Sequence, residues 1–471
     1  MDKMNYTSTD RKIEEYRDAV IETTQRMVRS SSVIGNAEEG KPFGKNIYDT
    51  LQLMLDICSD LGFRVYNGDG YFGWAEVGEG DDMIGILCHL DIVPVGEGWT
   101  HDPFAAEIID GRMYGRGTID DKGPTVAALY AVKSYVDLNP ALNKRIRLIF
   151  GCNEENDWIC MDHYKATQEL PTCGFVPDAE FPVIYAEKGI SFPILDAEFS
   201  EVSGTRILEF EGGSSANMVA GSCRAVVASA DTGRVVDSLA AITSEDLNGA
   251  EFEIIAEDGT VALKTNGRIA HGSTPWEGIN AISAMMYILG KIEDLNEEQA
   301  RFVRYYNDCI GFDTDGTKLC GRVVCDEASG SLVNNAGMCT MDENEAHLYL
   351  NERYPVTLQG SDLQDFISST ASSYGISARL RLDSPPGYVP VDDPMITKLM
   401  RVYRHYVDDD TEPLLIGGGT YARSMKNCVA FGPLLPGREE LAHCPDEFIF
   451  IDDLMLAAKI YAAAITKLCY E

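Results

Sequence analysis

Two polar side chains interrupt an apolar segment near residue 90 in a pattern that suits metal binding. The segment GILCHLDIVPV (85–95) has the hydrophobic residues of a covered strand, yet it contains His89 and Asp91 two positions apart. In a strand, this spacing places both side chains on the same face. A histidine that binds a metal through one ring nitrogen commonly donates a hydrogen bond from the other nitrogen to a carboxylate. The spacing therefore predicts a metal-binding His89 oriented by Asp91.

Further acidic residues recur where predicted strands end or helices begin. One pair lies in the glycine-rich turn YGRGTIDDKG, and another pair directly follows a predicted strand at 145–152. A single aspartate follows a short apolar run, and a second histidine precedes the last predicted helix. In chain order these residues are Asp120, Asp121, Glu154, Glu155, Asp178 and His443. Because ligands bind at the carboxyl ends of strands in open α/β sheets, we expect these side chains to converge.

So many carboxylates cannot lie close together without a cation, because like charges repel. Imidazole and carboxylate ligands without thiolates favour zinc, cobalt or manganese. One ion seldom needs this many ligands, whereas two ions that share a bridging carboxylate would use them all, and paired metals are common in hydrolytic enzymes. Of two adjacent glutamates, one can bind metal while the other stays free beside a bound water as a general base. The pattern predicts a two-metal hydrolytic centre.

Each of these features has a structural alternative when it is considered alone. A histidine within a strand is usually a hydrogen-bonded structural residue, and acidic pairs are usually solvated loop charges. The segment AHCPDEF around His443 would serve equally well as a helix cap. The ordered combination along one chain, rather than any single residue, favours the metal centre.

The elements that position these residues follow two patterns. Amphipathic helices are predicted at 10–30 and 45–61, and strands then alternate with helices, as in an α/β layer with a mixed sheet. Between about 190 and 380, many short alternating strands and a helix at 278–293 predict an α+β structure. The first pattern then returns. The predicted fold class is α/β, with a helix-flanked mixed sheet at 1–188 and 384–471, interrupted by an inserted α+β domain at 189–383.

Composition limits the classes of partner. The chain of 471 residues has 39 Lys and Arg against 75 Asp and Glu, a net charge of −36 that argues against nucleic acid and anionic membranes. The 13 cysteines contain no CxxC pair, which indicates reduced thiols. The N-terminus carries charges where a signal peptide needs an apolar core, and apolar stretches end short of the ~20 residues of a membrane span. These features predict a cytoplasmic protein.

Five motifs together resemble a known family. HLDIVPVGEGW, GRGTIDDKGP, NEENDWICMDHY, PDAEFP and AHCPDEF occur in the order and approximate spacing of the co-catalytic di-zinc metallopeptidases, which include aminoacylase, acetylornithine deacetylase, succinyl-diaminopimelate desuccinylase and carnosinase. The resemblance covers nearly the whole chain. HGSTPWEGINA and GGGTYAR are similar to the PepV-like bacterial dipeptidase branch of that family.

The resemblance implies a role for each candidate residue. The implied ligands are His89 and Asp178 for one metal, Glu155 and His443 for the other, and Asp120 as the bridge. Glu154 would be the general base and Asp91 would orient His89. Asp121 has no metal role in the family and is expected to be a turn or cap charge. Cys88 and Cys444, beside the two histidines, are not expected to bind metal.

The inserted domain corresponds to the lid domain of the family. His271 in NGRIAHGSTPWEGINA would stabilise the oxyanion of the tetrahedral intermediate, although a cap or surface role is the alternative. Asn217 and Arg353 match positions that hold the carboxylate of the substrate, a group that a guanidinium fits well, although Arg353 would also suit an edge strand. Backbone N–H groups could approach the same carboxylate, unless the segment is an ordinary flexible turn, at Gly417, Gly418 and Gly419.

The implied activity is hydrolysis of dipeptides by a water that bridges two divalent metals, with Glu154 passing the proton to the leaving amine. Zinc is the expected metal, with manganese or cobalt as alternatives. An N-acyl amino acid deacylase would use the same chemistry. A catalytically silent metal-binding homologue is the third alternative, and the retained Glu154 argues against it. The longer lid of the PepV-like branch predicts a monomer, with a dimer as the alternative.

Overall fold

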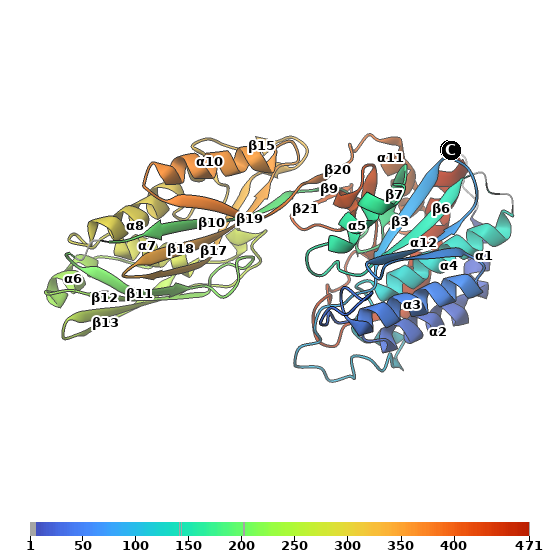
Figure 1. Cartoon of the computed structure of the whole chain (residues 1–471), viewed down its shortest axis with the longest axis horizontal. Helices are drawn as coiled ribbons and strands as arrows, with labels where there is room; N and C mark the ends of the chain where they lie inside the picture. The colour runs from blue at the N-terminus through green and yellow to red at the C-terminus, as the bar shows by residue number, and fades with distance from the viewer. Residues whose placement is uncertain (1–5, 141, 143, 201–202, 471) are drawn as a thin grey trace. The chain divides into compact units, whose positions relative to one another are not determined.

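The structure is a computed structural model that describes residues 6–470 except 141, 143, 201 and 202. The chain divides into two compact units (Figure 1). Unit 1 is Met1–Ala186 with Gly387–Glu471, and unit 2 is Glu187–Pro386. The predicted domain boundaries, after residues 188 and 383, lie two and three residues from these limits.

The main sheet of unit 1 is mixed. Its strand order is β1-β2-β6-β3-β7-β22-β9-β20, with β21 paired to β9. β3 runs parallel to both β6 and β7, whereas β2 pairs antiparallel with β1 and β6. All seven residues of β3 are buried, as expected for a strand covered on both faces. The strands are Arg64–Gly68 (β1), Phe72–Val77 (β2), Met83–His89 (β3), Arg145–Gly151 (β6), Cys173–Val176 (β7), Ile184–Glu187 (β9), Gly387–Tyr388 (β20), Leu414–Ile416 (β21) and Cys428–Ala430 (β22).

Helices pack against this sheet, and α4 lies beside α12 and against β3 (Figure 1). The helices of unit 1 are Thr7–Glu15 (α1), Arg17–Arg29 (α2), Lys45–Asp60 (α3), Lys122–Leu138 (α4), Ile159–Thr167 (α5), Pro394–Tyr406 (α11) and Ile451–Tyr470 (α12), with a short 3-10 helix at Tyr421–Ser424 (η2). Residues 10–30, predicted as one helix, belong to two helices that meet at Tyr16. The Tyr16 hydroxyl, between the two helices, donates to Asp137 of α4, which packs against α1.

Two small sheets carry loops of unit 1. One has the order β24-β5-β4, and the other pairs β23 with β8 in parallel. Their strands are Ile108–Ile109 (β4), Arg112–Tyr114 (β5), Ala179–Glu180 (β8), Pro433–Leu434 (β23) and Phe448–Phe450 (β24). The antiparallel pairing of Phe448 with Tyr114 brings the segment before β24 next to the loop after β5.

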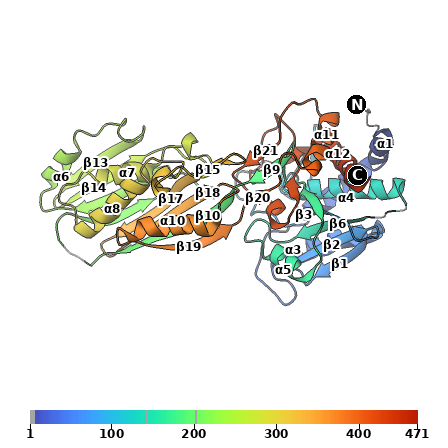
Figure 2. The ribbon, with the colours of Figure 1, turned by 90° about the horizontal axis from the view of Figure 1, so that it is seen from above.

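Unit 2 is built on an eight-stranded antiparallel sheet with helices packed on it (Figure 2). Along β18, the buried Ala346, Leu348 and Leu350 alternate with the more exposed His347 and Tyr349, the pattern of a sheet covered on one face. In sheet order, its strands are Glu251–Glu257 (β13), Thr260–Asn266 (β14), Ser222–Ala228 (β12), Arg206–Gly212 (β11), Val333–Asp342 (β17), Glu345–Tyr354 (β18), Gly189–Glu198 (β10) and Ser377–Ser384 (β19).

The remaining elements of unit 2 are mostly helical. They are Thr232–Leu239 (α6), Pro275–Glu277 (η1), Ala281–Leu289 (α7), Glu297–Cys309 (α8), Thr317–Cys320 (α9) and Gly360–Ser372 (α10), with a hairpin of Cys325–Asp326 (β15) and Gly330–Ser331 (β16). The predicted fold class, a mixed α/β unit interrupted by an α+β unit, is confirmed. Within the described residues, no helix combines the length and hydrophobicity needed to cross a membrane.

Candidate metal centre

Three adjacent strand ends bring the predicted residues of unit 1 together. β6, β3 and β7 are parallel neighbours in the sheet, so their carboxyl ends open on one edge. His89 is the last residue of β3, and the two glutamates and the aspartate follow β6 and β7 within four residues. Two loops complete the cluster, one before α4 and one before β24. The residues gathered there are His89, Asp120, Glu154, Glu155, Asp178 and His443.

Asp120 lies between the two histidines. One of its carboxylate oxygens is 2.7 Å from Nε2 of His89, and the other is 2.9 Å from Nε2 of His443. On the first side, Asp178 approaches the same His89 nitrogen at 3.6 Å. On the second side, Glu155 approaches the His443 nitrogen at 3.1 Å. Glu154 lies with His89 and Asp178 in one group of possible ligand atoms, and Glu155 lies with His89 and Asp120 in another, the atoms of each group being within 4.8 Å of one another.

The pKa values show a site with an excess of negative charge. Hydrogen bonds with Asp120 and Glu155 raise the pKa of His443 to about 11. Burial, reinforced by the Asp120 carboxylate, raises the pKa of Asp178 to about 7. Burial also raises the pKa of Glu154 well above its usual value. The cluster therefore favours bound positive charge, which protons supply when no other cation is present.

The donor set fits divalent metal ions. Two imidazoles and several carboxylates, with no thiolate among them, are ligands typical of zinc, manganese and cobalt. The division into a His89 side and a His443 side, with Asp120 in contact with both, fits two ions that share one carboxylate. Cys88 is buried and Cys444 is exposed, and neither belongs to the groups of possible ligands among the described residues.

Asp91 contacts the cluster differently from the prediction. β3 ends at His89, so residues 85–95 are not one continuous strand and His89 and Asp91 do not share a strand face. Nδ1 of His89 lies 3.0 Å from the backbone carbonyl of Asp91 and 3.6 Å from its carboxylate. The carboxylate instead accepts from the backbone N–H groups of Glu154 and Glu155, at 3.0 and 3.1 Å. Asp91 thus orients His89 through its main chain and both glutamates through its side chain.

Asp121 precedes α4, as expected for a cap residue, but it is fully buried. One oxygen of its carboxylate accepts from the backbone N–H of His89 and from the Thr125 hydroxyl, each at 3.1 Å. It therefore joins the start of α4 to the end of β3. The sequence shows an acidic pair here but does not show which member turns inward.

A cavity of about 210 Å³ opens on the cluster and is also lined by Gly419 and Thr420. In the glycine segment, Arg423 donates to the Gly418 carbonyl at 2.6 Å, and a Cβ atom on Gly419 would lie 2.1 Å from its guanidinium. A side chain at residue 419 would therefore displace the Arg423 guanidinium from this position. Because Gly419 lines the cavity, this part of the predicted glycine segment borders the cluster.

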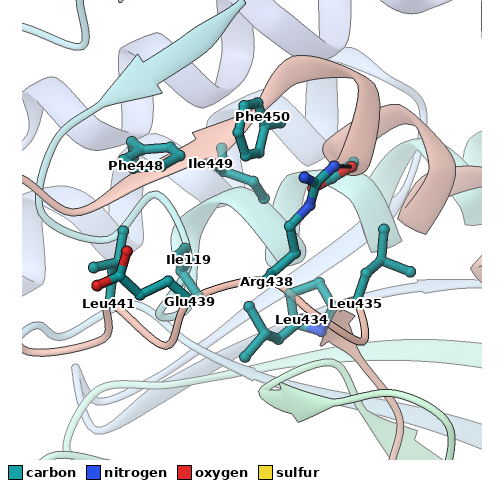
Figure 3. A pocket seen from close by; sticks show the side chains of 11 residues that line it. Ile119, Leu434, Leu435, Arg438, Glu439, Leu441, Phe448, Ile449 and Phe450 are labelled. Atoms are coloured by element: carbon teal, nitrogen blue, oxygen red, sulfur yellow. Dashed lines mark hydrogen bonds and ion pairs between the residues drawn. The ribbon is translucent and has the colours of Figure 1, made fainter.

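A smaller apolar pocket of about 40 Å³ adjoins this cavity (Figure 3). The two share Ile119, Pro433 and Leu434 in their linings. Figure 3 shows Phe448 and Phe450 of β24 on one side of this pocket and Leu434 and Leu435 on the other. An ion pair between Arg438 and Asp453, with atoms 2.6 Å apart, also belongs to its lining.

Unit 2 holds a second polar cluster that contains the other predicted residues. The chain at Met218 forms a β-bridge with His271, and the next residue, Gly272, donates to the Asn217 carbonyl at 2.7 Å. The backbone N–H of Ser273 donates to Nδ1 of His271 at 3.2 Å, and the Ser273 hydroxyl lies 2.6 Å from the same nitrogen. With Nδ1 as the acceptor, a neutral ring carries its proton on Nε2. Burial and the charge of Arg353 lower the pKa of His271, which favours this neutral form.

Asn351 belongs to the same cluster, although no sequence motif predicted it. Its side chain is fully buried, and its carbonyl oxygen accepts from Nε of Arg353 at 3.0 Å. A Cβ atom placed on Gly272 would lie 3.1 Å from this same oxygen. Asn351 thus links Arg353 to the turn that carries His271. Its position two residues before Arg353, on the same face of β18, is the only sequence signal of this contact.

Comparisons with known proteins agree with this fold and site. The sequence matches peptidase family M20/M25/M40 over residues 85–467, which is most of the chain. The chain belongs to this family. The predicted family of metallopeptidases is therefore confirmed.

Among its relatives, the Bacillus subtilis protein named "Putative dipeptidase YtjP" is 41% identical over 460 residues, covering 96% of this chain and 97% of that protein. The Staphylococcus aureus protein named "Putative dipeptidase MW1694" is 36% identical over 469 residues, covering 98% of this chain and 99% of that protein.

Solved structures share the fold at low sequence identity. The crystal structure of human carnosine dipeptidase 1 has a TM-score of 0.57 at 15% identity, covering 98% of each chain. That of aminoacylhistidine dipeptidase from Vibrio alginolyticus has a TM-score of 0.59 at 14% identity, covering 95% of this chain and 96% of that chain.

Proposed function

We propose that the protein is a metal-dependent dipeptidase with two divalent ions, expected to be zinc, with manganese or cobalt as alternatives. The observation that carries this proposal is the position of Asp120, whose two oxygens contact two different histidines. Side chains of His89 and Asp178 would hold one ion, and those of His443 and Glu155 the other. The two relatives named as putative dipeptidases, similar along the whole chain, support the substrate class.

When bound, such ions lower the pKa of water and polarise a carbonyl group. The chain itself supplies the proton transfer. Both glutamates line the cavity and each lies in a group of possible ligand atoms with His89, but Glu155 is also paired with His443. The Glu154 carboxylate would therefore take a proton from water and give it to the leaving amine. Asp91 fixes the backbone of both glutamates and so keeps these two roles on separate side chains.

The residues of unit 2 have the chemistry to bind the rest of a dipeptide. A neutral His271 offers an N–H from Nε2, which suits donation to a carbonyl oxygen that gains negative charge. Arg353, held by Asn351, suits the carboxylate of the substrate, and Asn217 adds an amide to the same cluster. In unit 1, the backbone N–H groups around Gly419 also suit a carboxylate. Gripping the free carboxylate at one end and enclosing the substrate would limit its length, so we propose dipeptides rather than proteins.

The test is hydrolysis of a substrate panel by the purified protein with added zinc, manganese or cobalt. We expect turnover of Ala-Ala-type or β-Ala-His dipeptides, with two metal ions per chain by elemental analysis. Faster turnover of N-acetyl amino acids would favour the deacylase alternative. Bound metal without turnover of either substrate class would indicate a silent homologue, and absence of bound metal would contradict the proposed centre.

We further propose that the enzyme acts as a monomer in the cytoplasm. All 13 cysteines are free thiols, which fits a reducing compartment. Light scattering tests whether the protein is a monomer. The mass of the purified protein in solution should be about 51.8 kDa, the mass of one chain.

A further inference from the structure

A buried carboxylate outside the ligand set organises the loop that carries Asp120. Glu447 is fully buried, and it lies four residues after His443 and directly before β24. The pairing of β24 with β5 places it against residues 115–120. Its backbone carbonyl accepts from the N–H of Gly115 at 2.9 Å, which fixes the start of that loop.

The side chain of Glu447 accepts several hydrogen bonds from the same loop. Oε1 accepts from the backbone N–H groups of Gly117 at 3.0 Å and Ile119 at 2.8 Å, and it lies 3.5 Å from the N–H of Asp120. Successive N–H groups that point at one oxygen form a concave anion site. Gly117 has φ of +91°, a left-handed conformation that glycine adopts without strain. The loop is thus wrapped around this carboxylate.

The other oxygen of Glu447 has a different partner. Oε2 accepts from Nη1 of Arg116 at 2.7 Å, and both side chains are buried. The guanidinium carbon of Arg116 lies 5.2 Å from the ring centre of Trp99. The Glu447 carboxylate therefore has two separable functions. One oxygen forms an ion pair with Arg116, and the other accepts hydrogen bonds from the backbone that leads into Asp120.

We propose that Glu447 is a positioning residue of the metal centre, which holds the backbone of the bridging Asp120 from the same short segment that supplies His443. This inference rests on the proposed metal centre. His443 contacts one oxygen of the Asp120 side chain, and Glu447 accepts from the backbone just before Asp120. The segment 443–447 therefore fixes both the side chain and the main chain of the bridge. Loss of the Glu447 carboxylate should loosen metal binding even where the fold is kept.

Two variants separate the ion pair from the backbone contacts. Arg116→Met removes the ion pair but leaves the carboxylate and its N–H donors in place. The double variant Arg116→Met with Glu447→Met replaces the pair with apolar side chains, a change that often preserves stability, but it leaves the N–H groups without their acceptor. Asp446→Asn is the matched control in the same turn, because Asp446 accepts from Thr100 and His101 rather than from the Asp120 loop.

Each variant is titrated with Co²⁺, by visible absorption and by competition with a chelator, and the unfolding temperature of the metal-free protein is measured. We expect Arg116→Met and Asp446→Asn to bind Co²⁺ nearly as the wild type does. The double variant should bind at least one Co²⁺ about tenfold to 100-fold more weakly, the range for residues that support metal ligands. Its absorption spectrum should also change, and its metal-free unfolding temperature should fall only moderately, because the N–H groups lose their acceptor while the buried charges are removed together.

Unchanged Co²⁺ affinity and spectrum in the double variant would overturn the inference, as would an equal loss in Arg116→Met. If the double variant does not fold, Glu447→Met decides by the same titration, because it removes the acceptor of the backbone N–H groups and leaves Arg116 in place. Wild-type affinity in Glu447→Met would then overturn it. A wild-type protein that binds no Co²⁺ would instead refute the metal centre, so the two failures are distinguishable.

Discussion

His443 of unit 1 and His271 of unit 2 have opposite electrostatic surroundings. In unit 1, His443 lies among carboxylates and its pKa is raised to about 11. In unit 2, burial and the positive charge of Arg353 lower the pKa of His271. The same residue type therefore favours its charged form in one cluster and its neutral form in the other.

This difference separates two kinds of chemistry. The cluster of unit 1 gathers acceptors and excess negative charge, and so it suits cations. The cluster of unit 2 gathers donors from imidazole, guanidinium and amide groups, and so it suits carbonyl and carboxylate oxygens. Peptide hydrolysis needs both, because a nucleophile must be generated and the developing oxyanion stabilised. Variants in the two clusters should therefore affect different measured quantities.

The largest effect is expected from removing the bridge. Asp120→Asn keeps the size of the side chain but halves its capacity as an acceptor for two cations. We expect both metal ions to be lost in dialysis and dipeptide hydrolysis to be abolished, as measured by elemental analysis and product assay. A variant that retained two ions and wild-type turnover would show that the two sides of the cluster do not depend on Asp120.

The next prediction distinguishes residues of unit 1 that bind metal from the residue that transfers the proton. Glu154→Gln removes the proposed base but leaves the proposed ligands intact. We expect kcat to fall about 10²–10⁴-fold, the usual contribution of general acid–base catalysis, while two ions remain bound. Glu155→Gln is the matched comparison and should lose metal as well as activity. If Glu154→Gln lost metal and Glu155→Gln kept it, the two glutamates would exchange roles.

The sequence predicts some contacts of the metal centre well and others not at all. His89 and the glutamates stand out because they interrupt or follow strongly apolar strands, so a local pattern reveals them. The contact of the Asp91 carboxylate with two backbone N–H groups depends on β3 ending at His89, which hydrophobicity alone does not specify. The sequence around Glu447 likewise gives no sign of its hydrogen bonds. Its partners lie more than 300 residues earlier, and only the pairing of β24 with β5 brings them into contact with it.

In unit 2, the largest change is expected at His271. His271→Ala removes the proposed donor to the oxyanion, and we expect kcat to fall about 10²–10³-fold, as for other single oxyanion donors. Metal content should stay at the wild-type value because the histidine belongs to the other unit. Steady-state kinetics and elemental analysis on the same sample check this. A loss of metal would contradict the separation between the two clusters.

Arg353 should affect binding more than turnover. Arg353→Met removes the guanidinium that Asn351 orients. We expect KM for a dipeptide to rise about 10-fold to 100-fold, because a hydrogen bond to a charged group contributes about 1.5–3 kcal/mol. A dipeptide amide, which lacks the carboxylate, should be hydrolysed equally slowly by both proteins. An equal rise in KM for the dipeptide and its amide would mean that Arg353 does not bind the carboxylate.

The smallest expected effect is on the stability of the fold, and it comes from a pair of residues outside both clusters. In unit 2, Nδ1 of His347 is 2.6 Å from Asp196, and this hydrogen bond raises the pKa of the histidine. A raised pKa in the folded state means that the pair stabilises the fold fully below the unfolded pKa of about 6.5. The contribution is then lost as the pH rises through the raised folded value. Both side chains are partly exposed, so we expect only about 0.5 kcal/mol.

His347→Gln tests this dependence through unfolding temperatures measured between pH 5 and pH 9. The variant should be less stable than the wild type at the acidic end, and the difference should disappear at the alkaline end. Asp196→Asn is the control that removes the nearer partner, and in its background the substitution of His347 should have a smaller pH-dependent effect, because Glu345 still lies 3.5 Å from Nε2 of His347. Asp196 also pairs with Arg379 at 2.6 Å, so this control protein should be less stable than the wild type throughout. A stability difference for His347→Gln that grew toward pH 9 would have the wrong sign, and it would show that His347 is held in its neutral form, as His271 is.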